Sequence, residues 1–195
     1  MIDYFTEYKK GESYTYGLKC TSPVYDVDVR DVVYVGEGEK RIIQIAHDVH
    51  SRKFMQVHVA ARADVRIEVI LSAPRDIVID SYVDVIHEGN EGKSEVIVRG
   101  CTEGNGRIIC RMRTHVPHEI FHVTATQDVS LYQFGVGGII DCIPVLEIKN
   151  KTTNSQHAVR LEKISDIEYW YAAHAGISSY HFQSMKKQSL LTQVI

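Results

Sequence analysis

Residues 65–71 read Val-Arg-Ile-Glu-Val-Ile-Leu, and the pattern of this segment indicates the class of secondary structure. Positions 65, 67, 69 and 71 are all apolar, so the apolar residues recur with a period of two. This period is typical of a β-strand that is buried on one face. Residues 26–30 (Asp-Val-Asp-Val-Arg) alternate in the same way. The pattern therefore predicts an all-β protein around these stretches.

Similar runs rich in Val, Ile, Tyr and Thr continue to about Leu161. They begin near Arg41, Phe54, Ile77, Ser94, Arg107, Ile120, Val129 and Ile139. Turn residues separate the runs, as at Gly104-Asn105-Gly106. Two architectures fit this pattern. One is an antiparallel sandwich or jelly roll in which Asn105-Gly106 closes a hairpin, and the other is a parallel β-helix with one strand on each side of every coil.

The end of the chain carries helix signals instead. Ser165 and Glu168 have the spacing of a capping box, which predicts a helix from about Asp166 to Ala175 that ends at Gly176. A second helix is expected from about Ser179 to Thr192. We therefore divide the chain into an N-terminal segment (1–24) that the pattern does not assign, a β-rich core (25–164) and a C-terminal helical segment (165–195).

Composition excludes several classes of protein. The 195 residues carry 22 basic and 25 acidic side chains, a net charge of −3, and no basic cluster, which argues against nucleic-acid binding. The N-terminus lacks the apolar stretch of a signal peptide. The longest uncharged stretch, 129–140, is too short to cross a membrane. The four cysteines form no CxxC motif. These features predict a cytoplasmic protein without a membrane anchor.

Residues 118–122 (His-Glu-Ile-Phe-His) match the HExxH motif of zinc hydrolases. The motif binds zinc only on a helix, where the two histidines lie one turn apart. Pro117 and the strand-forming residues after it favour a β-strand, in which His118 and His122 would lie about 13 Å apart. A zinc metallohydrolase that uses His118, Glu119 and His122 is therefore kept as an alternative function.

A distributed pattern near the C-terminus points elsewhere. Its elements are Ile143-Pro144, Leu146-Glu147-Ile148, Asn150, His157, the helix that begins at Ser165, and Ala175-Gly176-Ile177. Together they resemble the C-terminal signature of the SufB/SufD family, the scaffold subunits of an iron–sulfur cluster assembly machine. The segments 95–100 and 105–109 are similar to the glycine-punctuated coils of that family.

The resemblance implies a right-handed parallel β-helix with two short C-terminal α-helices, in a shortened member of the family. Asn105-Gly106 would then turn a corner of a coil. It also implies a non-enzymatic scaffold that acts with a SufC-like ABC-type ATPase. A second SufB/SufD-like subunit, or a second copy of this chain, would pair with the edge of the β-helix. An iron–sulfur cluster would be held only transiently. A metal-free β-helix that serves as a protein-interaction module is the remaining alternative.

Cys142 and His157 are the cluster or iron ligands that the resemblance implies. His157 matches the family histidine, whereas Cys142 occupies a position that is usually threonine and the family cysteine position is Gly138. Cys142 and His157 would lie on adjacent coils if Pro144 starts a coil and residues 150–154 form the return turn. Alternatively, Cys142 is a small buried apolar residue and His157 packs in an interface.

The helical segment is where the family docks its ATPase. The residues expected to bind this partner are Ser165, Glu168, Trp170, Tyr171 and Phe182. Aromatic side chains supply much of the binding energy of protein interfaces. The alternative is that the two helices only cap the open end of the β-helix, as terminal elements of solenoids do.

Overall fold

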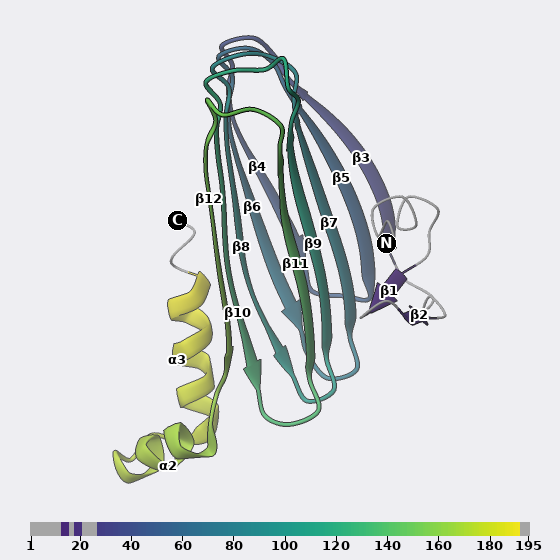
Figure 1. Ribbon diagram of the computed structural model, residues 1–195. Helices are drawn as coiled ribbons and strands as arrows, with labels where there is room; N and C mark the ends of the chain where they lie inside the picture. The colour runs from purple at the N-terminus through teal and green to yellow at the C-terminus, as the bar shows by residue number, and fades with distance from the viewer. Residues whose placement is uncertain (1–12, 16–17, 21–26, 192–195) are drawn as a thin grey trace.

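A parallel β-helix forms the main body of the computed structural model, which describes residues 13–15, 18–20 and 27–191. Its ten strands alternate between two five-stranded sheets (Figure 1). We call them the odd sheet, with the strand order β11-β9-β7-β5-β3, and the even sheet, with the order β12-β10-β8-β6-β4. Every pair of neighbours in the two sheets is parallel. Parallel pairing confirms the β-helix and excludes the antiparallel sandwich.

The strands of the two sheets have similar lengths. The odd sheet contains β3 (Val27–Val35), β5 (Ser51–Val59), β7 (Val78–His87), β9 (Arg107–Val116) and β11 (Ile139–Ile148). The even sheet contains β4 (Lys40–His47), β6 (Asp64–Ala73), β8 (Lys93–Glu103), β10 (Thr124–Phe134) and β12 (Asn154–Lys163). A separate antiparallel pair, β1 (Ser13–Thr15) and β2 (Leu18–Cys20), lies in the N-terminal segment.

The core lies between the two sheets. Val65, Ile67, Val69 and Leu71 of β6 all belong to this core and are completely or almost completely buried. The strict alternation that predicts this strand is therefore the alternation between the inner and the outer face of the even sheet. The inner faces of neighbouring strands repeat it, so the apolar side chains stack from coil to coil.

The coils lengthen toward the C-terminal end. Val27 pairs with Ser51, 24 residues later, whereas Arg107 pairs with Ile139, 32 residues later. The corner between β8 and β9 contains Asn105-Gly106, as the resemblance implies. A Cβ atom on Gly106 would lie 2.1 Å from the carbonyl oxygen of Ala73. Only glycine therefore lets the two coils approach this closely at the corner.

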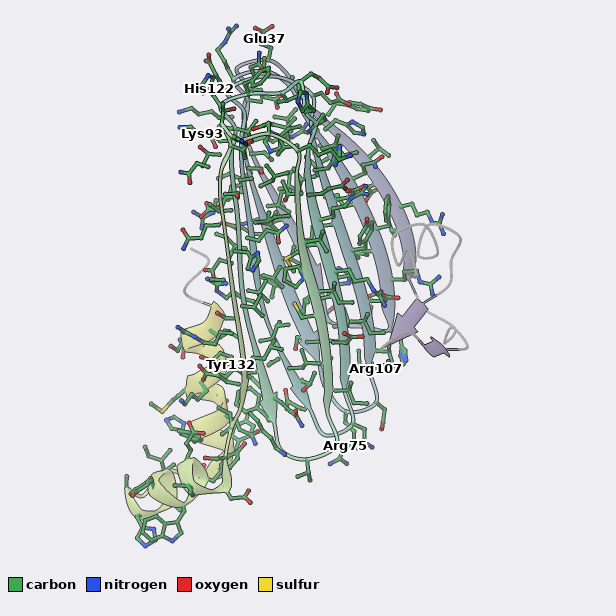
Figure 2. The ribbon with its side chains drawn as sticks, in the orientation of Figure 1. Glu37, Arg75, Lys93, Arg107, His122 and Tyr132 are labelled. Atoms are coloured by element: carbon green, nitrogen blue, oxygen red, sulfur yellow. The ribbon has the colours of Figure 1, made fainter. Side chains whose placement is uncertain are left out.

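The runs predicted to begin near Ile120 and Val129 are one strand, β10, which begins at Thr124. Residues 117–123 form the turn that precedes it. Figure 2 shows His122 of this turn at one end of the strands, and Arg75 and Arg107 toward their opposite end. β-Branched residues in a turn thus mimicked the start of a strand.

Two helices follow the last strand, as predicted. The helix α2 (Asp166–His174) begins after the N-cap Ser165, and α3 (Ser179–Leu191) follows Gly176, whose φ is +76°. The helices pack through Phe182 and Tyr169 onto Cys101 and Phe134 on the outer face of the even sheet. They do not cover the ends of the strand stack. Neither of these helices is long and apolar enough to cross a membrane.

Candidate functional site

The C-terminal end of the β-helix presents two edge strands, β11 and β12. One side of each strand pairs with β9 or β10, and the other side has no strand neighbour within the described part of the chain. The inward-facing apolar side chains of this last coil are only partly covered. Val159 is 41% exposed and Leu161 is 51% exposed, and Ile140 and Cys142 are half-buried. An edge of this kind is a template for pairing with another strand.

Cys142 lies on the inner face of β11, where it packs against the main core. Its register partner on β9 is Cys110, which is buried. The contact with the Cys142 thiol and burial both raise the pKa of Cys110. Burial keeps the Cys110 thiol protonated because its thiolate would lack solvation. Cys142 is thus the thiol of this pair that lies nearer to solvent.

His157 lies on β12, which faces β11 across the interior of the last coil. Its register partner is the buried Gln127, whose Nε2 donates to Thr114 Oγ1 at 3.0 Å on the opposite sheet. His157 is therefore on the inner face of the even sheet, but it is exposed because no further coil follows β12 within residues 27–191.

The structure does not bring Cys142 and His157 together. β11 and β12 are successive strands of one coil in opposite sheets, so the expectation of adjacent coils is wrong. Because Thr114 pairs with Leu146, His157 lies across from Leu146. Cys142 is four residues away on the same strand, about 13 Å along it. One chain therefore cannot place both side chains on a single ion in this arrangement.

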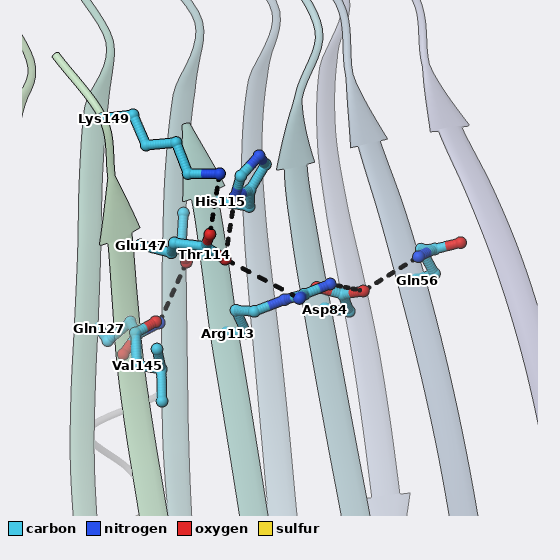
Figure 3. A network of polar contacts seen from close by, with 9 residues as sticks. All are labelled: Gln56, Asp84, Arg113, Thr114, His115, Gln127, Val145, Glu147 and Lys149. Atoms are coloured by element: carbon cyan, nitrogen blue, oxygen red, sulfur yellow. Dashed lines mark hydrogen bonds and ion pairs between the residues drawn. The ribbon is translucent and has the colours of Figure 1, made fainter. Parts of the chain in front are cut away.

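A row of polar side chains on the outer face of the odd sheet connects the edge strand β11 to β9, β7 and β5 (Figure 3). The buried carboxylate of Asp84 on β7 accepts hydrogen bonds from Arg113 Nε and Nη2, both at 2.8 Å. Gln56 Nε2 on β5 donates to the same carboxylate at 2.9 Å. Arg113 Nη1 then lies 3.9 Å from Glu147 Oε2 on β11. We call this row, from Gln56 to Glu147, the polar clamp.

Electrostatics at the outer end of the polar clamp favour an ionised carboxylate. Glu147 lies 3.1 Å from both Lys149 Nζ and His115 Nδ1. Burial raises the pKa of Glu147, but the contacts with Lys149 and His115 outweigh it and the pKa is lowered. At the buried end, the bidentate contact with Asp84 raises the pKa of Arg113. The clamp therefore holds the edge strand β11 through charged groups.

The five residues expected to bind a partner have two kinds of environment. Ser165 and Glu168 form the predicted capping box, with Ser165 N donating to Glu168 Oε2 at 2.9 Å. The backbone hydrogen bond from Ser165 is the main cause of the lowered pKa of Glu168. Phe182 packs on the sheet. Trp170 and Tyr171 are different, because they are 55% and 64% exposed.

Trp170, Tyr171 and Ile167 form an exposed apolar surface on α2, which we call the α2 patch. Trp170 and Tyr171 contact each other edge to face, and the ring of His174 lies 3.8 Å from that of Trp170. Ile167 is equally exposed. Exposed aromatic and aliphatic side chains that lie together mark interaction surfaces. Since the helices lie against the outer face of the even sheet, capping of the open end does not explain this surface.

One comparison with known proteins identifies the family. Residues 35–185 match the family model for "SUF system FeS cluster assembly, SufBD core domain". The match covers most of the chain, from the end of β3 into α3. The chain belongs to the SufBD core family. No match is found among curated proteins. The SufBD core domain has a role in SUF iron–sulfur cluster assembly, as the resemblance in residues 137–177 implies.

The HExxH motif of this SufBD core domain does not lie on a helix. His118, Glu119 and His122 lie in the turn between β9 and β10, and all three are exposed. His122 has a φ of +58°, which is incompatible with a helix. Within the described residues, no group of three or more His, Cys, Asp or Glu side chains could hold a metal. The motif therefore lacks the geometry that a zincin requires.

Sequence patterns missed the polar clamp and the Cys110–Cys142 contact. In both cases the residues that meet are about one coil apart in sequence, as with Asp84 and Arg113. Strand alternation places each residue on a face but does not give the register between coils. Cys142 meets Cys110 because Pro144 pairs with Met112, a register that the pattern within one strand does not show.

Proposed function

We propose that this SufBD core domain is a non-enzymatic, cytoplasmic scaffold subunit for iron–sulfur cluster assembly. In this proposal it works with a SufC-like ABC-type ATPase and with a second SufB/SufD-like subunit or a second copy of itself. The open edge of β11 and β12 carries the proposal, because it combines unpaired backbone, exposed apolar side chains and a nearby thiol. The iron–sulfur cluster is the cargo of this scaffold.

Edge pairing is the proposed contact with the second subunit. Two copies related by a twofold axis would join their edge strands in antiparallel orientation, which satisfies backbone groups that otherwise face water. Val159 and Leu161 would then gain apolar neighbours. The half-buried Ile140 and Cys142 would be covered at the same time. The apolar burial and the new backbone hydrogen bonds both favour association.

The ligands for iron would come from both sides of this interface. Cys142 offers a soft sulfur ligand, and His157 offers an imidazole, the usual replacement for cysteine in such clusters. The two side chains lie about 13 Å apart along the strands of one chain. An iron site whose ligands come from two subunits therefore fits the structure better than a site whose ligands all come from one chain.

Cluster formation at Cys142 is tested by anaerobic reconstitution with iron and sulfide. The wild type is expected to gain visible absorbance, and Cys142→Ser is expected to lose most of it, because serine is a much poorer iron ligand than a thiolate. Cys101→Ser is the matched control, since Cys101 is buried on the outer face of the even sheet. Equal absorbance in all three proteins would contradict the assignment, and no absorbance in any of them would favour the metal-free interaction module.

The α2 patch is the proposed docking surface for the ATPase. Trp170→Ala and Tyr171→Ala are each expected to weaken co-purification with a SufC-type ATPase, by roughly 10-fold or more in the dissociation constant, because exposed aromatic residues are frequent binding hot spots. Binding is measured by calorimetry with purified proteins.

Tyr34→Ala is the matched control, because Tyr34 is an equally exposed tyrosine on β3, away from the helices. It should bind the ATPase as the wild type does. Unchanged binding by both α2 variants would rule out this surface as the docking site.

A further inference from the structure

Cys110 and Cys142 occupy matching positions on adjacent parallel strands. They are register partners on β9 and β11, and both side chains belong to the inner face, where they pack into the same core. Neighbouring strands lie about 4.8 Å apart. This separation falls within the range of about 4.4–6.8 Å that disulfides span between Cα atoms. Cys142 packs against the core cluster that contains Cys110.

Among the cysteines of residues 27–191, no other pair has this relation. Cys101 lies on the outer face of the even sheet, packed with Phe134 and Ile164. The sheet itself therefore separates it from the two inner thiols. Cys101, Cys110 and Cys142 are all free in the structure. The reduced pair is thus arranged for a bond that has not formed.

We infer that Cys110 and Cys142 are the site of an intramolecular disulfide that closes the last coil of the β-helix. The bond would join β9 to the edge strand β11 and enclose the whole of β10 in a covalent ring. It is a modification site of the scaffold. If the function proposed above is correct, the bond also removes the Cys142 thiol from the ligands available to iron.

A small-molecule disulfide, such as oxidised glutathione, supplies the oxidant. The thiolate of Cys142, the more accessible of the two, attacks one sulfur of the reagent and releases one glutathione thiolate, which takes up a proton. The Cys110 thiol then attacks the sulfur of Cys142, gives its proton to the departing sulfur and so releases the second glutathione as a thiol. Two protein thiols lose two hydrogens in total, and one glutathione disulfide becomes two thiols.

Mass spectrometry of iron-free protein tests the inference. The protein is treated with oxidised glutathione and denatured in N-ethylmaleimide, and intact mass and tryptic peptides are then measured. We expect a loss of two hydrogens and a cross-link between peptide 108–111 and peptide 114–149, which trypsin separates at Arg111 and Arg113. Oxidation should also raise the melting temperature by several degrees, because the bond restricts the unfolded chain.

Matched variants make the outcome specific. Cys101→Ser should keep both the cross-link and the rise in melting temperature, whereas Cys142→Ser should lose both. Cys110→Ala serves as a second loss variant. A stable glutathione adduct on Cys142 with Cys110 still open to alkylation, or a cross-link through Cys20 or Cys101, would overturn the inference. Because no iron, sulfide or ATPase is present, failure here is distinct from failure of the scaffold proposal.

Discussion

At the scale of single residues, buried histidines make the fold sensitive to acid. His87 is completely buried at the end of β7, with its Nε2 2.9 Å from Ser94 Oγ, and burial lowers its pKa to about 4. The unfolded chain binds a proton near pH 6.5, whereas the folded chain does not until about pH 4. The free energy of unfolding should therefore fall by about 3 kcal/mol between these pH values on account of this residue.

Urea unfolding at pH 7 and at pH 4 measures this effect. Because His87→Gln cannot titrate, the stability difference between wild type and variant should shrink by about 3 kcal/mol at the lower pH. His118→Gln, at an exposed histidine in a turn, is the control and should follow the wild type. A His87→Gln curve parallel to the wild-type curve would disprove the assignment.

At the scale of strands, the polar clamp determines how firmly the edge strand is held. Asp84 is completely buried and pairs with both Nε and Nη2 of Arg113. Its replacement in Asp84→Ala leaves the guanidinium without its main partner, so we expect a loss of about 3 kcal/mol or more in the free energy of unfolding. Glu162→Ala breaks the exposed pair with Arg160 and should cost less than about 1 kcal/mol. Urea unfolding measures both losses. A loss in Asp84→Ala as small as the one expected for Glu162→Ala would show that the clamp adds no stability.

Local sequence signals predict the strands and helices better than they predict the contacts between them. Alternation located the strand at residues 65–71, and the capping box placed α2 within one residue at its C-terminal end, because both signals are local. The separation of Cys142 from His157 was not predicted. It depends on which sheet each strand joins, and two strands of one coil have the same local pattern whichever sheet they enter. The contacts of Cys142 with Cys110 depend on register between coils, which alternation leaves open.

At the scale of the whole molecule, the two ends of the β-helix differ in what they offer a second copy. If pairing uses the C-terminal edge, Leu161→Asp should weaken self-association or subunit pairing by roughly 10-fold or more, because a carboxylate would be buried without a partner. Ile42→Asp is the control on β4, the terminal strand at the other end of the even sheet, where Ile42 is exposed on the outer face. Sedimentation equilibrium measures both. A larger effect of Ile42→Asp would place the interface at the opposite end.

The lengthening of the coils from 24 to 32 residues has a consequence for how this architecture can vary. Closing a loop costs entropy that grows only with the logarithm of its length, so the longest coil is about 0.3 kcal/mol more expensive to close than the shortest. Extra residues at a corner therefore burden folding very little, provided that the stacked side chains inside remain unchanged. The corners of the coils can therefore change in length during evolution at little cost, whereas the packed interior has to keep its shape.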